Sequence, residues 1–495
     1  MRGRDRGLCL VTGATGYIGG RLVPELLDAG YRVRCLARSP GRLRAQPWIG
    51  RVEVVRADVA DAAAVRRALD GVRVAYYLVH ALVRGRGFPE EDRRAARTFA
   101  AAVLDAGVGR IVYLGGLGPL GPDVSEHLRS RAEVGSILLA SGVPTAVLRA
   151  AVVVGSGSAS FEMMRYLTER LPVMVTPRWV HTRTQPIAVG DVLWYLVGCA
   201  ELPSSVNRAF DIGGPDVLTY EEMMRRYAAV AGLPRRVVVP VPVLSARLSS
   251  LWVGLVTPVP GRLARPLAES QRHEVVCREH DIARFVPDPP GGLTEFDEAV
   301  RLALRCVRDV RVSRASAPGD PSPGDPAWAG GTLCADVREC PVAAPPEALW
   351  RVIEGIGGAA GWYSWSAAWA VRGGIDRLFG GVGMRRGRRE PHRLRVGDAV
   401  DFWRVEEILP GKLLRLRAEM RLPGLAWLEL AIEARRGRTW LRQRVLFRPR
   451  GFVGLLYWWA SRPFHGVVFG GMRRGVRRAA EREAARVGGR AVRVR

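Results

Sequence analysis

A glycine-rich turn near the N-terminus constrains the fold of this chain more than any other feature. The apolar stretch Leu8–Thr12 has the composition of a buried strand. Gly13, Gly16 and Gly19 follow it at the start of an amphipathic, helix-like segment that Gly30 closes. Such glycines let the backbone turn tightly and let a pyrophosphate approach the first amides of the helix, where the helix dipole favours negative charge. The spacing differs from the commoner G-x-G-x-x-G, but the strand, turn and helix together predict a dinucleotide site.

The residue after the second predicted strand indicates which dinucleotide binds. An acidic side chain there binds the 2'-hydroxyl of NAD, whereas an arginine accommodates the 2'-phosphate of NADP. The segment 31–46 contains no Asp or Glu, and Arg38 stands at the end of the strand, with Arg34 and Arg42 nearby. We therefore predict NADP(H) rather than NAD(H). The alternative is that Arg38 is one more surface arginine in an arginine-rich chain.

Strands and helices alternate along the rest of the first 154 residues. Apolar, strand-like runs at 52–55, 74–80, 110–114 and 145–154 are separated by helix-like segments at 62–69, 90–106 and 125–141. This alternation predicts an α/β Rossmann fold, a doubly wound parallel sheet covered by helices on both faces. Asp58 follows the third strand, where a carboxylate can accept from the adenine amino group. Asp61 is a candidate N-cap of the next helix.

Composition shifts mark a second domain. The segment 313–330 is a linker, rich in proline, glycine, serine and aspartate, between a domain at 1–312 and a domain at 331–495. The second domain opens with a proline-initiated helix, continues with strand-like runs between 400 and 447, and ends in a helical stretch from about 454 to 485. Alternating polarity in these runs predicts an antiparallel meander with one wet face, an α+β domain. Most of the 14 tryptophans lie here, as the lining of a cavity or as core packing.

Charge and cysteine content limit the function classes. The formal net charge is +27, almost all of it arginine because Lys412 is the only lysine, and the surplus is concentrated in 331–495. Nucleic acid, anionic lipid or an acidic partner could each exploit such a surface, but no nucleic-acid motif accompanies it, so we expect no nucleic-acid partner. The seven cysteines are scattered without a C-x-x-C pair, which predicts reduced thiols, a cytoplasmic protein and no metal site. The N-terminus runs straight into the first strand and leaves no room for a signal peptide.

One C-terminal stretch is apolar enough to raise the question of a membrane. Gly451–Met472 is interrupted at mid-length by Arg462, Pro463 and His465, and a charge at that depth costs about 2.5–3.5 kcal/mol on insertion scales. We therefore predict a soluble capping helix. Peripheral contact with a membrane stays open, with the Arg385–Arg389 cluster and the tryptophans as candidate anchors.

The first 310 residues or so resemble the atypical and extended short-chain dehydrogenase/reductase family, specifically its NmrA-like, NAD(P)H-binding branch. The motifs that carry the resemblance are Thr12–Gly19, Arg38, Asp58-Val59, Leu78-Val79-His80, Tyr113–Gly116 and Pro186–Val192. The resemblance implies cofactor contacts from Gly13, Thr15, Gly16, Tyr17, Ile18, Arg38, Asp58, Val59, Leu78, Val79, His80 and Arg131. The second domain resembles the helix-grip fold of START and polyketide-cyclase-like proteins, in which a long helix closes over a sheet and leaves an apolar cavity.

The chain differs from this family at the positions of the family's catalytic residues. The family uses a serine after the fifth strand and a Tyr-x-x-x-Lys on the next helix. Here the serine region is Gly115–Gly118, His127 stands where the tyrosine is expected, and Arg131 stands where the lysine is expected. Their i, i+4 spacing places both on one helix face. A histidine can act as an acid or base near neutral pH, whereas an arginine holds ribose hydroxyls without exchanging protons.

Two functions follow from this pattern. The first is an NADP(H)-dependent oxidoreductase that acts on an apolar small molecule such as a quinone, a lipid or a polyketide-like compound, with catalysis by His127 and Arg131. The second is a non-catalytic NADP(H)-binding sensor or assembly protein. Insertions from about residue 155 would build the substrate pocket, although they suit an ordinary core equally well; the candidate residues are Met163, Met164, Tyr166, Met174, Trp179, His181, Thr182 and Arg183.

Overall fold

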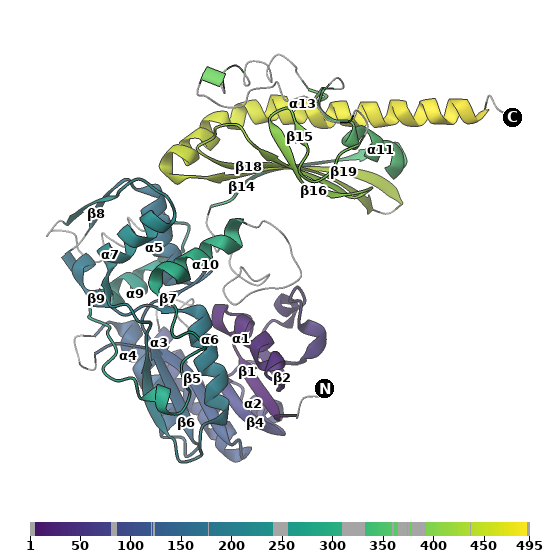
Figure 1. Cartoon of the computed structure of the whole chain (residues 1–495). Coiled ribbons are helices and arrows are strands. Elements are labelled where there is room, and N and C mark those ends of the chain that lie inside the picture. The colour runs from purple at the N-terminus through teal and green to yellow at the C-terminus, as the bar shows by residue number, and fades with distance from the viewer. Residues whose placement is uncertain are drawn as a thin grey trace. The chain divides into compact units, whose positions relative to one another are not determined.

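The computed structural model describes residues 5–80, 87–119, 121, 124–176, 178–240, 256–308, 332–358, 361–364, 374, 377–378, 390, 393–435 and 437–492. The chain divides into two compact units, Met1–Gly331 and Thr332–Arg495 (Figure 1). The predicted linker at 313–330 and the Arg385–Arg389 cluster lie outside the described residues.

A seven-stranded parallel sheet forms the centre of the first unit, in the order β11-β6-β5-β4-β1-β2-β3. This order reverses direction beside β1 and confirms the predicted doubly wound Rossmann sheet. The strands are β1 (Leu8–Thr12), β2 (Arg32–Ala37), β3 (Glu53–Arg56), β4 (Val72–Tyr77), β5 (Arg110–Gly116), β6 (Thr145–Ala150) and β11 (Arg208–Ile212).

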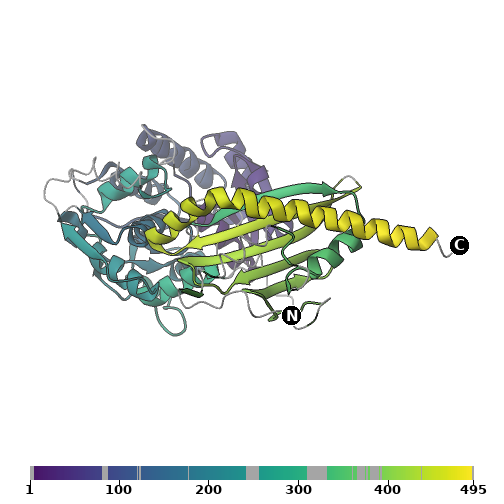
Figure 2. The same cartoon turned by 90° about the horizontal axis from the view of Figure 1, so that it is seen from above.

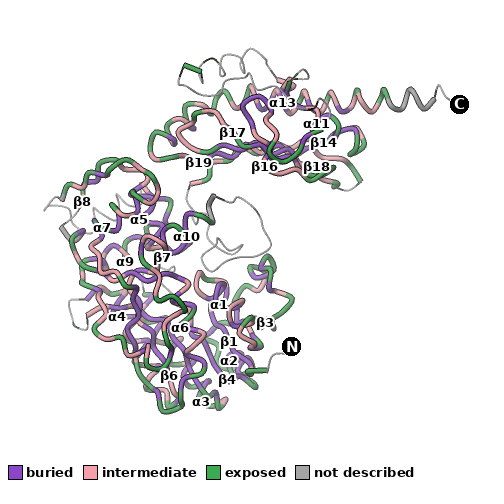
Figure 3. The backbone as a smooth tube through the Cα atoms, in the orientation of Figure 1, coloured by how far each residue is buried: buried purple, intermediate pink, exposed green. Residues whose placement is uncertain are grey.

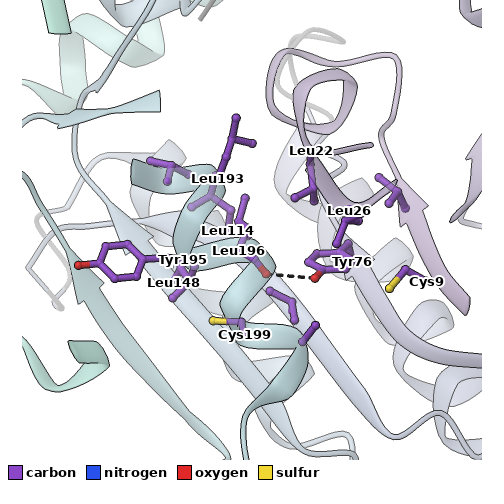
Figure 4. Packing of buried hydrophobic residues seen from close by; sticks show 14 of the residues in the cluster. Cys9, Leu22, Leu26, Tyr76, Leu114, Leu148, Leu193, Tyr195, Leu196 and Cys199 are labelled. Atoms are coloured by element: carbon purple, nitrogen blue, oxygen red, sulfur yellow. Dashed lines mark hydrogen bonds between the residues drawn. The ribbon is translucent and has the colours of Figure 1, made fainter. Parts of the chain in front are cut away.

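Helices cover both faces of this sheet, as buried apolar residues on both sides require. One face packs against α1 (Tyr17–Asp28) and α6 (Val189–Gly198), and the other packs against α2 (Ala62–Ala68), α3 (Phe88–Asp105) and α4 (Glu126–Leu139). Figure 3 shows the buried residues gathered along the central strands. In the core between β4 and α6, the Tyr76 hydroxyl donates to the Leu196 carbonyl at 3.0 Å (Figure 4).

Local signals in the sequence are satisfied where helices begin. The Asp61 carboxylate accepts from the Ala64 amide at 3.0 Å and caps α2, as predicted. Thr219 and Glu222 form a complete capping box at the start of α7 (Tyr220–Val230). Both contacts join residues three positions apart, so they depend on the local sequence alone.

A smaller layer of helices and short strands follows β6. It contains α5 (Ala159–Arg170), α7, α9 (Gly261–Ser270) and α10 (Phe296–Arg308), together with the strand pairs β7–β10 (Val153–Val154, Ile187–Ala188), β9–β12 (Arg183–Thr184, Leu218–Thr219) and β8–β13 (Val173–Thr176, Val237–Pro240). Five short 3-10 turns complete the described part of this unit, at Pro40–Leu43, Ile49–Arg51, Arg178–His181, Cys199–Glu201 and Asp281–Arg284.

In the part of the second unit that the structure describes, a six-stranded antiparallel sheet carries two helices on one face, which confirms the predicted meander. The strand order is β14-β19-β18-β17-β16-β15, and Figure 2 shows the long helix α13 lying along the sheet. The elements are β14 (Cys334–Val342), α11 (Pro346–Glu354), β15 (Ala399–Val400), β16 (Trp403–Leu409), β17 (Leu413–Ala418), β18 (Gly424–Arg435), β19 (Arg438–Pro449) and α13 (Gly451–Val492). One core cluster joins both helices to the sheet.

Candidate functional site

The turn between β1 and α1 is built so closely that a side chain is excluded at Gly13 and at Gly19. Gly13 has φ +75°, and a β-carbon on it would stand 2.6 Å from the Leu78 carbonyl oxygen. A β-carbon on Gly19 would stand 2.3 Å from the Gly13 oxygen. Gly16 precedes α1, where none of the described side chains caps the helix and the first turn carries no acidic residue. The first helical amides and the dipole are therefore suited to an anion, and this cradle fits the pyrophosphate of a dinucleotide.

Thr12 joins this turn to the end of β4. Its hydroxyl donates to the Tyr76 carbonyl at 2.9 Å and accepts from the Leu78 amide at 3.1 Å. Leu78 and Val79 are thereby held beside the glycine turn. The sequence analysis missed this role of Thr12, because a threonine at the end of a buried strand is also ordinary strand composition.

Arg38 and Asp58 lie together at the other end of the predicted cofactor site. They follow the neighbouring strands β2 and β3, and a guanidinium nitrogen of Arg38 lies 4.0 Å from a carboxylate oxygen of Asp58. Both side chains are about half exposed, so this ion pair is weak and leaves the guanidinium accessible to a phosphate. Arg34 is different, because it is held by Glu53 at 2.7 Å and by the Ala68 and Asp70 carbonyls at 2.8 Å.

His127 and Arg131 lie on α4, one turn apart, as predicted. Burial first, and then the positive charges of Arg131 and His80, lower the pKa of His127 from 6.5 to about 3. His80 follows β4. The structure therefore brings His80, His127 and Arg131 close enough for their charges to interact. A pKa of about 3 leaves the His127 imidazole neutral at physiological pH.

Arg131 closes onto the carboxyl end of β5. Its guanidinium donates to the Leu114 carbonyl at 2.5 Å and lies over the Tyr113 ring, with the guanidinium carbon 5.2 Å from the ring centroid. The Tyr113 hydroxyl donates to the Arg131 carbonyl at 3.2 Å, and burial raises the pKa of Tyr113 to about 12. Tyr113 therefore does not replace the family's acidic tyrosine.

The region in which the family has its serine is Gly115–Gly118 here, so no hydroxyl side chain faces helix α4 from it. A β-carbon on Gly116 would stand 3.2 Å from the Leu128 side chain and 3.9 Å from that of Arg131. The space that a serine would use therefore opens toward Arg131. A serine at Gly116 would also crowd Leu128, because 3.2 Å is a tight contact for a β-carbon.

Arg21, a buried arginine that the sequence analysis did not single out, joins α1 to the segment that follows β7. Its guanidinium donates to the Tyr17 and Ser156 carbonyls, both at 3.1 Å, and lies over the Tyr17 ring at 4.2 Å. A β-carbon on Gly155 would stand 2.3 Å from the Tyr17 hydroxyl. The signal in the sequence was a charged residue on the apolar face of an amphipathic helix.

The segment expected to line a substrate pocket contributes mainly to the core. Met163, Met164, Tyr166 and Met174 are each at most 5% exposed, and most of them pack in two apolar clusters with α7 and α9. His181 lies 3.1 Å from the Glu221 carboxylate. The three methionines and Tyr166 therefore follow the core alternative, whereas His181 and Arg183 are exposed.

A small polar hollow lies beyond the carboxyl ends of β5, β6 and β11. Its floor is an ion pair at 2.6 Å between Arg149 and the fully buried Asp211, whose carboxylate also accepts from the Arg278 amide at 3.0 Å. The lining residues are Leu117, Gly118, Pro119, Arg149, Asp211, Glu274, Val276 and Arg278. Ligands of open α/β sheets bind outside the carboxyl ends of the strands, so this hollow is a candidate subsite for a polar substrate group.

The second unit has a pocket of about 380 Å³ between β14 and α13. Asp336, Arg338, Trp458, Arg462 and His465 are among its lining residues, so the pocket is mixed in character rather than wholly apolar. Of the tryptophans that the structure describes in this unit, five are buried, as the prediction of core packing requires: Trp350, Trp362, Trp403, Trp427 and Trp458. Within the described residues, no cluster of histidine, cysteine or carboxylate side chains could hold a metal.

Two family models match the chain. A model described as NAD(P)H-binding matches residues 13–151, and one described as a protein of unknown function (DUF2867) matches residues 328–472. The first contains the glycine turn, Arg38, His127 and Arg131. The second covers most of the antiparallel unit without assigning it a role.

Relatives that are named as reductases match about half of the chain. The (4-alkanoyl-5-oxo-2,5-dihydrofuran-3-yl)methyl phosphate reductase of Streptomyces griseus is 31% identical over 237 residues, which is 46% of this chain and 76% of that protein. The ceramide reductase of Caulobacter vibrioides is 30% identical over 265 residues, which is 50% of this chain and 80% of that protein. A Citrobacter triphenylmethane reductase complexed with NADP(H) aligns over 60% of this chain and all of its own, at 19% identity and a TM-score of 0.49.

Proposed function

The chain belongs to the NAD(P)H-binding, atypical short-chain dehydrogenase/reductase family, and we propose that it is an NADPH-dependent reductase of an apolar, electron-poor small molecule. The observation that carries the proposal is the pairing of an intact nucleotide cradle at Gly13 and Gly19 with a His127 whose pKa is about 3. The cradle supports cofactor binding. The residues that stand in place of the family's serine, tyrosine and lysine limit the class of substrate that could be reduced.

The preference for NADPH rests on Arg38. Its accessible guanidinium lies at the end of β2, the position from which a side chain reaches the 2'-substituent of the ribose. The neighbouring carboxylate, Asp58, follows β3 and accepts from the Ala60 amide at 3.0 Å, which suits the role proposed for it at the adenine. A cationic fork at this place favours a phosphate over a hydroxyl.

Other residues of the chain would bind the remaining parts of the cofactor. Gly13, Thr15 and Gly16 would bind the pyrophosphate, and Leu78 and Val79 would border the cofactor. Arg131 would hold ribose hydroxyls as a fixed cation, in the place of the family's lysine. Bound NADPH supplies a hydride at its nicotinamide ring.

The acid–base groups favour a particular class of acceptor. Arg131 does not release a proton at neutral pH, Gly116 offers no hydroxyl, and His127 carries no ionisable proton above pH ~5, about two units above its pKa. Reduction of an isolated carbonyl creates a strongly basic alkoxide, which needs a positioned acid. A quinone or a conjugated enone instead gives a delocalised anion that water can protonate. We therefore propose that His127 orients the acceptor as a neutral hydrogen-bonding group.

The relatives support an apolar, conjugated substrate. The Streptomyces griseus enzyme is named for an alkanoyl-substituted 5-oxo-2,5-dihydrofuran, a ring alkene activated by carbonyl groups. The Caulobacter vibrioides enzyme is named for ceramide, a lipid. We extend the proposal to the second unit, whose pocket of about 380 Å³ would hold or deliver part of such a ligand.

The test is the oxidation of NADPH, followed by its absorbance, with matched acceptors. We expect turnover with naphthoquinones and alkyl-substituted enones, and at least about 100-fold slower turnover with saturated ketones of similar size, a difference of roughly 2.7 kcal/mol in barrier. Equal rates with both classes would contradict the proposed substrate class.

A second candidate, a non-catalytic NADP(H)-binding sensor or assembly protein, is favoured by the loss of the family's serine, tyrosine and lysine at Gly116, His127 and Arg131. The same experiment separates the two functions. NADPH that binds with a measurable affinity, but is oxidised by none of the quinones, enones and ketones, would support the second candidate.

A further inference from the structure

The first half of α13 presents an apolar face to solvent. We call it the α13 apolar face. Its large side chains are 56–69% exposed, a high value for residues of this type. They are Phe452, Val453, Leu456, Trp459, Phe464 and Val467. Patches of this kind on soluble proteins mark interaction sites.

The helix is apolar on two sides, and packing against the sheet explains only one of them. Trp458 packs with Phe447 and Ala426 of the sheet, and Phe469 and Met472 enter the main core of the second unit. The exposed residues follow the spacing 452, 456, 459 and 460, 464, 467, so they form a separate stripe along the helix. Packing against the sheet therefore accounts for one side of the helix and leaves the other side without a structural explanation.

The charges around the α13 apolar face are of one sign. Arg450 and Arg462 are exposed beside it, and the sequence contains no Asp or Glu from Ala434 to Ala480. The guanidinium carbon of Arg462 lies 5.2 Å from the ring centroid of Trp459. The acidic residue nearby on the sheet, Asp336, is held by Arg338 at 2.8 Å. The stretch of sequence that carries the α13 apolar face therefore has a net positive charge.

We propose that the α13 apolar face lies in the plane of an anionic phospholipid surface. Aromatic and aliphatic side chains enter the boundary between headgroups and acyl chains, while the flanking arginines contact lipid phosphates. Among the described helices, none is long and apolar enough to cross a membrane. The single sign of the charge favours an anionic lipid surface over a second copy of this chain, because a second copy would bring the same arginines.

The experiment is co-sedimentation of the full chain with vesicles of phosphatidylcholine, alone or mixed equally with phosphatidylglycerol. We expect binding to the mixed vesicles that weakens in high salt, and little binding to phosphatidylcholine alone. Arg462→Ala should weaken binding about fivefold, the effect of one arginine near an anionic surface. Equal binding to both vesicles, or none to either, would overturn the proposal.

A matched pair of substitutions tests the face itself. Val453→Asp places a charge on the α13 apolar face, and Val396→Asp makes the same change at a residue of similar exposure outside α13, 64% against 67%. Val453 is near the start of the helix, where an acidic residue is favourable, so the fold should persist. We expect Val453→Asp to reduce vesicle binding at least about tenfold and Val396→Asp to leave it unchanged. A dimer that Val453→Asp dissociates, without any vesicle binding by the unchanged chain, would show that a second copy covers this face and would overturn the proposal.

Discussion

The Gly13 carbonyl oxygen lies 2.3 Å from the point where a β-carbon of residue 19 would stand. This closeness ties the glycine turn to the first turn of α1 and leaves no space for even a methyl group. The same glycine, with φ +75°, also faces the Leu78 carbonyl. The cradle is therefore defined by backbone atoms of two strands and a helix, and a methyl group is enough to test it.

We predict that Gly19→Ala impairs both the fold and the cofactor site. The added methyl must displace the Gly13 carbonyl, which should cost about 1–3 kcal/mol in the free energy of unfolding. NADPH affinity, measured by titration calorimetry, should fall at least about tenfold. Gly50→Ala is the control, because a β-carbon there meets nothing within 4 Å. Unchanged affinity in Gly19→Ala would show that the cofactor does not use this turn.

We predict that Arg38→Ala selectively weakens NADPH. A hydrogen bond between charged groups contributes about 1.5–3 kcal/mol, so NADPH affinity should fall about 10- to 150-fold while NADH affinity stays constant. Arg51→Ala removes an equally exposed arginine, paired with Asp28 at 3.2 Å, and should leave both affinities unchanged. Equal losses for the two cofactors in Arg38→Ala would mean that Arg38 acts on the fold rather than on the phosphate.

We predict that the turnover of a quinone or enone has no ionisation that belongs to His127 between pH ~5 and ~8. A group with a pKa of about 3 is neutral across that whole range, so kcat should not change through its titration. His127→Gln keeps a neutral donor and acceptor and should retain kcat within about threefold. An acidic limb near pH ~6.5 that disappears in His127→Gln would instead make His127 a general acid.

We also predict that His127 destabilises the fold in acid. Its pKa is about 3 in the folded chain and about 6.5 when unfolded, so between these values the unfolded state binds more protons. The free energy of unfolding should therefore fall as pH decreases through this window. His127→Gln should reduce the slope of stability against pH, measured by urea unfolding from pH 4 to 7, and an unchanged slope would contradict the lowered pKa.

We predict that a buried ion pair in the second unit is sensitive to the loss of one partner. Arg415 and Glu429 face each other on β17 and β18, with Nε and Oε1 2.8 Å apart, and both residues are less than 10% exposed. Glu429→Gln leaves the buried guanidinium with Glu407 at 3.5 Å, so unfolding of this unit should require about 3 kcal/mol less. The double variant Arg415→Met/Glu429→Leu should lie within about 1 kcal/mol of the unchanged chain.

A more exposed ion pair of the same sheet provides the control for this prediction. Glu433 pairs with Arg435 and Arg442 at the end of the same sheet, where water screens the charges. Glu433→Gln should therefore cost less than about 1 kcal/mol in the same denaturant titration. A cost as large as that of Glu429→Gln would show that burial is not the cause.

The outcomes in the first unit separate local from distant interactions. The strand, turn and helix around Gly16 and the cap at Asp61 depend on neighbours a few positions apart, and the sequence predicted both of them. Arg21 was missed because its partner, the Ser156 carbonyl, is 135 positions away. Met163 and its neighbours suited a pocket or a core equally well, since composition does not say which face of a helix is covered.

The sequence by itself determined the parallel sheet and the glycine turn after its first strand, because glycine geometry and the period of apolar residues are local properties. It also predicts that a dinucleotide binds at this turn, with Arg38 beside its ribose. Only the tertiary structure decided how His127 behaves. Its pKa follows from burial and from the charges of Arg131 and His80, and His80 comes from a different strand end. The electrostatic energy of a side chain is set by everything packed around it, so the chemistry of this site depends on contacts that the order of residues does not display.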